Sequence, residues 1–250
     1  MKRVLFEIAF NGKNYHGWQI QENAITIQEI IQEKLSVLIR PFNDINLVGC
    51  GRTDKGVHAE QFFFHVDFPD DIDYDNFLYK FNQILPSDIL IKSHQIVDSD
   101  FHARFSAISR TYEYRLTQKK EPFLNSLFSY IRYDLDIGLM NNCCEKLISY
   151  KDFTSFSKVH TDVNNFICNV TEAFWRQEKH QLIFTIKSNR FLRNMVRAIV
   201  GTMLLVGRKK ISVQDFCHII ESENRSAAGP SVKAKGLFLV NVAYQINEQE

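Results

Sequence analysis

The sequence predicts an α+β protein of two similar halves, each a mostly antiparallel sheet with helices on one face. Three observations support this prediction. Apolar residues alternate at strand spacing in some segments, recur at helical spacing in others, and the two kinds of segment follow a comparable order twice. We expect one domain at 1–105 and a second at 106–250, with a cleft between them where a ligand would bind.

The first half has the clearer pattern. Its expected elements, in order, are a strand at 3–10, a helix at 26–40, two strands flanking a glycine-rich loop, a helix at 74–85 and a strand at 89–97. Thr26 and Glu29 are spaced as a capping box at the start of the first helix, and Pro86 ends the second. This β-α-β-β-α-β order is typical of ferredoxin-like and RNA-recognition domains.

The second half is expected to return to a comparable order. Its expected elements are strands at 107–117 and 127–133, a helix at 136–149, strands at 166–177 and 181–187, helices at 191–206 and 212–222, and a strand at 236–245. No residue-level repeat links the halves, so a duplication is a hypothesis from element order alone. Candidate loops are 11–24, 155–166 and 223–235.

Composition limits the class of protein. Of the 250 residues 45% are hydrophobic, which is enough for packed cores, yet no apolar run approaches the roughly 20 residues that span a bilayer. The N-terminal apolar stretch is too short for a secretion signal, so we expect a cytoplasmic protein without a membrane partner. The five cysteines include no C-x-x-C pair, which favours buried thiols over a disulfide framework or a zinc site.

Charge is nearly balanced, with a net value of +1. Its distribution is uneven, because seven Lys or Arg residues and no acid occur within 187–210, whereas 67–75 is densely acidic. One basic face would suit a polyanion such as nucleic acid. An ordinary charged surface is the alternative interpretation.

The most informative segment is the glycine-punctuated loop Gly49–Ala59, which places Asp54 between the cations Arg52 and Lys55. Apolar residues before the loop and the alternating Phe62 and Phe64 after it indicate strands, so the loop would present Asp54 from a rigid sheet. The two cations are expected to favour the ionised carboxylate, as a nucleophile requires. The glycine spacing fits neither a P-loop nor a dinucleotide loop. A plain turn is the competing interpretation.

The expected helix at 191–206 has two apolar rows, which we predict to lie in the core. Arg190, Arg193 and Arg197 fall on an adjoining row at spacings of three and four. An arginine there could project into the cleft. The alternative is a side chain that covers apolar surface while its charged end stays in water.

The Asp54 loop and six further ordered segments together resemble the tRNA pseudouridine synthases of the TruA type. The loop motif G-R-T-D-K-G-V-H-A at 51–59 is highly specific, and the others are individually weaker. Those others are 15–19 (YHGWQ), 101–107 (FHARFSA) with 110–112 (RTY), 152–156 (DFTSF), 191–197 (FLRNMVR) and 236–239 (GLFL).

The resemblance implies a cofactor-independent and metal-free isomerase that acts on uridines 38, 39 and 40 in the anticodon stem-loop of tRNA and works as a homodimer. It makes Asp54 the nucleophile and Arg52 its helper, which fills the space left when the target base flips out. Tyr112 would stack on the uracil and act as the base at C5, and Arg197 would pair with Asp54. We expect Arg190 and Arg193 to bind the RNA substrate.

Two other interpretations stay open at this point. The chain could be a non-catalytic RNA-binding module of the same fold, although Asp54, Arg52 and Tyr112 are all present. It could also be a pseudouridine synthase that acts on another RNA site. His16, His58 and His102 occur within the motifs, but we assign them no proton transfer, since a lone histidine is more often structural. Tyr112 itself could serve only sheet packing.

Overall fold

The computed structural model describes residues 1–39, 46–68, 72–158 and 165–245. These residues form two compact units: unit 1 contains 1–108 and the chain from Leu239 onward, and unit 2 contains Ser109–Phe238. The domain boundary between residues 105 and 106, which we expected from the sequence, stays a prediction. Among the described residues, no helix has the length and apolar character that crossing a bilayer requires.

Unit 1 has the predicted β-α-β-β-α-β order. Its elements are β1 (Lys2–Phe10), the 3-10 helix η1 (Gly12–Asn14), α1 (Ile27–Leu38), β2 (Val48–Gly49), β3 (His58–Phe68), α2 (Tyr74–Ile84), β4 (Ile89–Val97) and most of β9 (Leu237–Tyr244). Its strands follow the order β4, β1, β3, β9, and β2 also pairs with β3. Strand β1 is antiparallel to both of its neighbours, and β2 is antiparallel to β3.

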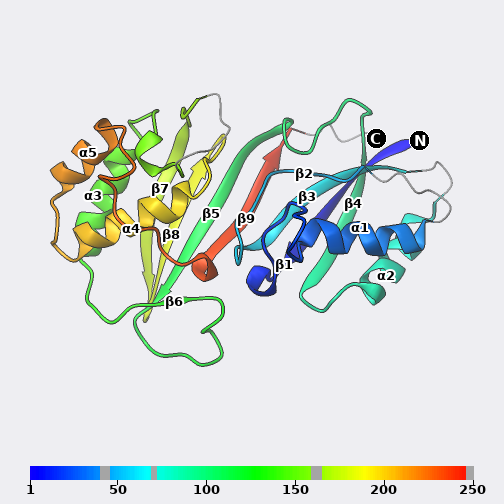
Figure 1. Ribbon diagram of the computed structural model, residues 1–250, viewed down its shortest axis with the longest axis horizontal. Coiled ribbons are helices and arrows are strands. Elements are labelled where there is room, and N and C mark those ends of the chain that lie inside the picture. Colours follow the sequence, from blue (N-terminus) through cyan, green and yellow to red (C-terminus); the bar gives the residue numbers. More distant parts are fainter. Residues whose placement is uncertain (40–45, 69–71, 159–164, 246–250) are drawn as a thin grey trace. The chain divides into compact units, whose positions relative to one another are not determined.

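Aromatic rings fill the core of unit 1. Phe6 of β1 lies opposite Phe64 of β3, with ring centroids 5.1 Å apart, and Phe68 packs against Phe77 of α2 at 5.2 Å. Helices α1 and α2 lie beside each other against the strands of this unit (Figure 1). The alternation seen in the sequence therefore places its apolar side under the helices.

Unit 2 combines three strands and three helices with shorter elements. They are β5 (Ala107–Thr117), β6 (Ser129–Tyr130), α3 (Ile137–Leu147), the 3-10 helix η2 (Thr154–Phe156), β7 (Val170–Glu178), β8 (Gln181–Ser188), α4 (Met195–Gly207), α5 (Val213–Glu221) and the 3-10 helix η3 (Ala234–Gly236). Strands β5, β8 and β7 are antiparallel neighbours, and β6 pairs with β5 in parallel. With two helices in unit 1 and three in unit 2, the described chain is α+β, as predicted.

Helix α4 is the centre of the core of unit 2. All but two of its residues are buried, including Ile199 and Met203. It contacts α3 and α5, and the Nε1 of Trp175 on β7 lies 3.4 Å from the Sδ of Met203. A helix that is apolar all round must be covered on all sides, so the predicted core position of its two apolar rows is confirmed.

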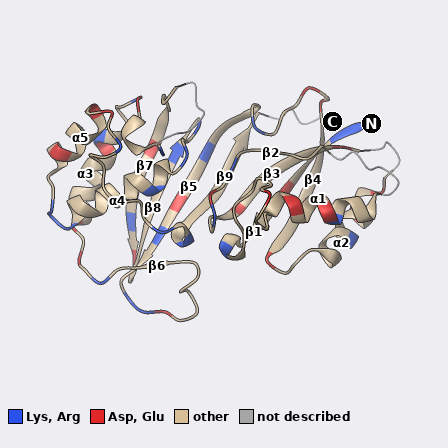
Figure 2. Cartoon of the chain, viewed as in Figure 1, with Lys and Arg blue, Asp and Glu red and all other residues tan. Residues whose placement is uncertain are grey.

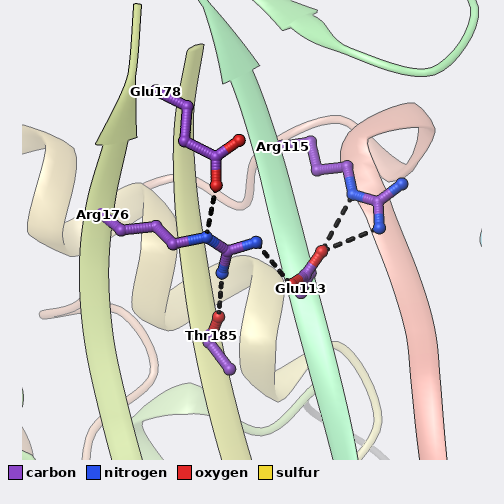
Figure 3. A network of polar contacts seen from close by, with 5 residues as sticks. All are labelled: Glu113, Arg115, Arg176, Glu178 and Thr185. Carbon is purple, nitrogen blue, oxygen red and sulfur yellow. Dashed lines mark hydrogen bonds and ion pairs between the residues drawn. The ribbon is translucent and has the colours of Figure 1, made fainter.

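Polar side chains that face one another join the three strands of unit 2 (Figure 3). Glu113 of β5 accepts hydrogen bonds from Arg115 at 2.7 Å and from Arg176 of β7 at 2.9 Å, and Arg176 also donates to Glu178 and to Thr185 of β8. Burial alone would raise the pKa of Glu113, but the two arginine hydrogen bonds outweigh burial and hold that pKa below its ordinary value. The network therefore keeps Glu113 ionised and ties β5 to β7.

Two predicted elements are corrected by the structure. The helix expected at 191–206 begins at Met195, because Asn194 adopts a left-handed conformation (φ 68°) that the α-helix cannot contain. The strand expected at 127–133 is reduced to Ser129–Tyr130, since only that short segment pairs with β5. Parts of the helix at 26–40, the acidic stretch 67–75 and the loop 155–166 lie outside the described residues.

Candidate active site

The Asp54 loop of unit 1 is a tight turn at the start of β3. The N–H of Val57 donates to the carbonyl of Asp54 at 3.1 Å, and Gly56 adopts φ 77°. A four-residue turn with a positive φ at its third residue needs glycine there. Asp54 is half-buried and Arg52 is exposed at this turn. The loop joins β2 to β3, as predicted, and Asp54 lies within it.

A second segment, residues 12–18, holds this loop in place. The carbonyl of Tyr15 accepts from the N–H of Gly56 at 3.1 Å, and the carbonyl of Thr53 accepts from the N–H of Trp18 at 3.4 Å. Gly17 lies so close to the loop that an added Cβ would collide with the carbonyl oxygen of Thr53. The sequence indicated a loop at 11–24 but gave no sign of this bracing role.

The side chains of Trp18 and His58 also support the Asp54 loop. Trp18 is 3% exposed and its ring lies 4.2 Å from that of Phe62, so Trp18 packs in the core of unit 1. His58 is buried, and its Nδ1 accepts from the N–H of Gly12 at 3.1 Å. These contacts make Trp18 and His58 structural residues of the loop's base.

The cation Lys55 faces a histidine. Its Nζ lies 2.8 Å from the Nε2 of His16. His16 stands next to Tyr15 and Gly17, the residues that brace the loop. The sequence placed His16 in a motif but did not pair it with Lys55.

Tyr112 lies in unit 2, on β5. Its ring meets the ring of Phe191 edge to face, with centroids 5.0 Å apart. Phe191 belongs to the segment that leads into α4, so Tyr112 lies beside the start of that helix. Two residues further along β5, Tyr114 is buried on the same side of the strand.

Arg197 lies in the first turn of α4 and is held by the loop that precedes β9. Its Nε donates to the carbonyl of Val232 at 2.8 Å, and the N–H of Val232 donates back to the carbonyl of Arg197 at 3.1 Å. Burial raises the pKa of Tyr114 to about 12, and the charge of Arg197 acts on the phenol in the opposite direction. Arg197 thus places a cation at the N-terminal end of α4, where the helix dipole disfavours positive charge.

Arg190 and Arg193 do not lie on the helix, contrary to the predicted row of arginines. Both precede α4, whose first residue is Met195. The Nη1 of Arg190 donates to Asn165 at 3.1 Å, and Arg193 is exposed. They nevertheless lie near the same end of α4 as Arg197.

The seven basic residues of 187–210 do not form one group. Arg208, Lys209 and Lys210 follow the last residue of α4, whereas Arg190, Arg193 and Arg197 lie at its start, about 20 Å away along a helix of 13 residues. Lys209 lies 3.2 Å from Asp136. Lys and Arg also occur on β5 and β8, and α1 and α5 carry Asp and Glu (Figure 2).

Potential metal ligands and thiols both occur in the described part of the chain. There, no three His, Cys, Asp or Glu side chains gather closely enough to hold a metal ion. All five cysteines are buried. Burial raises the pKa of Cys143 to about 12, which makes this thiol unreactive.

The class of protein follows from comparison with known families. The family profile described as tRNA pseudouridine synthase matches residues 144–245, from within α3 to the end of β9. This match covers Arg197 and the loop that holds it.

Matches to individual relatives extend over nearly the whole chain. The chain is 46% identical over 245 residues to a protein of Parabacteroides distasonis and 47% identical over 246 residues to one of Bacteroides fragilis, covering 98% of this chain and 96% and 97% of those proteins. It is 36% identical to a Bacillus subtilis protein, over 97% of this chain and 99% of that one. All three are named tRNA pseudouridine synthase A, and the chain belongs to this family of isomerases.

Proposed function

We propose that this chain isomerises uridine to pseudouridine in tRNA, at positions 38, 39 and 40 of the anticodon stem-loop. The observation that carries the proposal is a carboxylate, Asp54, at the first position of a turn that a second segment braces, in a chain of this family. Pseudouridine forms when the bond from N1 of uracil to C1′ of ribose breaks and a bond from C5 to C1′ replaces it. The C5 proton leaves and N1 gains one, so no redox step is needed.

Asp54 is assigned the nucleophilic role. Its carboxylate either adds to C1′, as in a glycosidase intermediate, or removes the ribose 2′ proton to start elimination. Both routes need an ionised carboxylate held at a fixed position. The turn closed by Val57 and braced by Tyr15 supports that requirement.

Arg52, next to Asp54, is the residue we assign to the space left by the flipped base, and its exposure supports this role. Tyr112 supplies a ring for stacking on uracil and a hydroxyl that removes the C5 proton. Arg197, fixed by Val232, is assigned to pair with the Asp54 carboxylate. The proposal therefore includes the cleft between two ferredoxin-like halves that the sequence predicted.

Arg190 and Arg193 are assigned to the RNA backbone, because charged contacts to phosphates supply most of the affinity for folded RNA. We further propose that the protein acts as a homodimer, as the family resemblance implies, and that it acts in the cytoplasm.

Site mapping tests the target. A tRNA transcript is prepared with uridines only at 38–40 within the anticodon stem-loop, alongside a second in which cytidines replace them and pairing is restored on the opposite strand. We expect pseudouridine in the first transcript and none in the second at these positions. Pseudouridine elsewhere would assign another RNA site, and tight binding without pseudouridine in either would favour a non-catalytic RNA-binding module.

A further inference from the structure

Lys55 carries a positive charge that its own partner does not neutralise. Its ammonium lies 2.8 Å from the Nε2 of His16, and among the described residues no carboxylate lies within ion-pair distance of it. An ammonium has only donors, so the Nε2 of His16 must accept and the ring must be neutral. The pair therefore keeps the full charge of one cation.

The arrangement has a cost for the fold. When Nε2 accepts, the ring proton sits on Nδ1, and this atom is buried without a hydrogen-bond partner among the described residues. A buried donor left without an acceptor destabilises the folded state. Fixing a lysine side chain costs further rotamer freedom. Local costs of this kind are expected where function needs a group in one position.

The position that results is fixed relative to Asp54. Lys55 directly follows Asp54 in the turn, and the adjacent Gly56 is hydrogen-bonded to Tyr15, the neighbour of His16. His16 is tied in turn by its N–H, which donates to the carbonyl of Ile25 at 2.9 Å. The backbone of both residues is thus fixed, and the ammonium contacts His16 one residue away from the candidate nucleophile.

We propose that Lys55 binds a phosphate of the RNA backbone beside the target nucleotide, and that His16 is the positioning residue that holds Lys55 for this contact. The inference rests on the proposed function, because it needs RNA at the Asp54 loop. A phosphodiester suits a lysine, which acts as a compact point charge. A cation already held in place loses less side-chain entropy when it binds.

The alternative is that the contact between Lys55 and His16 only braces the loop. A brace would contribute to stability, but it would not release counterions when RNA binds. The salt dependence of binding therefore separates the two roles.

The experiment measures the affinity of the full-length protein for a tRNA transcript between 50 and 200 mM salt. Lys55→Met keeps the aliphatic stem and removes the charge, and Lys80→Met, at an exposed position on α2, is the matched control. We expect Lys55→Met to reduce the slope of log affinity against log salt by about 0.7–0.9, so that its deficit shrinks about threefold over this range. The control should keep the wild-type slope. An unchanged slope for Lys55→Met would overturn the proposal.

His16 is tested through Lys55. His16→Leu removes the acceptor, and His16→Gln keeps an acceptor oxygen close to the position of Nε2. We expect weaker tRNA binding for His16→Leu, recovery for His16→Gln, and no further loss when His16→Leu is added to Lys55→Met, because both changes remove one interaction. Additive losses would show that His16 does not act through Lys55. Binding is measured without turnover, so a failure of the proposed catalysis would not be mistaken for a failure here.

Discussion

Replacing Gly17 with alanine is expected to loosen the Asp54 loop from the segment that braces it. Gly17 has φ 92°, which costs an L-residue about 1–2 kcal/mol. The new methyl group would also collide with the carbonyl oxygen of Thr53 and lie 3.2 Å from the carbonyl carbon of Asp54. Overpacking of this kind costs about 1–3 kcal/mol. The two effects sum to about 2–5 kcal/mol of lost stability.

Gly51→Ala is the matched control within the same loop. A Cβ at Gly51 meets no atom within 4 Å, and no positive φ is found there. We expect its stability to stay within about 0.5 kcal/mol of wild type, as for an ordinary surface change. Thermal unfolding followed by circular dichroism measures both variants, and isomerase activity is assayed below the transition. A Gly17→Ala protein that unfolded at the wild-type temperature with full activity would contradict this prediction.

Further predictions concern the two cores and the response to pH. The hydroxyl of Tyr114 donates to the carbonyl of Lys233 at 2.8 Å, and Tyr114→Phe removes this donor. Chemical denaturation should show that the free energy of unfolding falls by about 1–3 kcal/mol. An unchanged denaturation midpoint would contradict this prediction. Burial, aided by the charges of Arg3 and His102, lowers the pKa of His65 to about 4. As the pH falls, the unfolded chain therefore protonates His65 at a higher pH than the folded protein does. We expect the free energy of unfolding to fall by up to about 3 kcal/mol as the pH is lowered from 6.5 to 4. His65→Gln should flatten this fall, and an equally steep pH profile in the variant would refute the assignment.

Patterns among neighbouring residues were enough to predict several helices, strands and turns. The capping box formed by Thr26 and Glu29 is present at the start of α1, and β4 has the predicted bounds. These features depend on neighbouring residues, whose propensities and spacing are visible in the chain itself. The turn at Asp54 was predictable for the same reason, since Gly56 supplies its positive φ.

Contacts between distant segments could not be predicted in this way. Arg197 and Val232 are 35 residues apart in sequence, and Lys55 and His16 are 39 apart. Neither pair follows a spacing rule. The start of α4 was misplaced because Asn194 interrupts an apolar pattern that otherwise continues at helical spacing. A single left-handed residue therefore removed Arg190 and Arg193 from the helix on which the pattern placed them.

The roles proposed for the site depend most directly on Asp54. Release of tritium from tRNA that carries 5-tritiated uridine measures loss of the C5 proton, and it is followed for the wild-type protein and for Asp54→Asn, which keeps the shape of the side chain and removes its charge. We expect release by the wild type and a decrease on the order of a thousandfold or more in the variant, with tRNA binding retained. Equal release by Asp54→Asn would contradict the assignment of this carboxylate as the nucleophile.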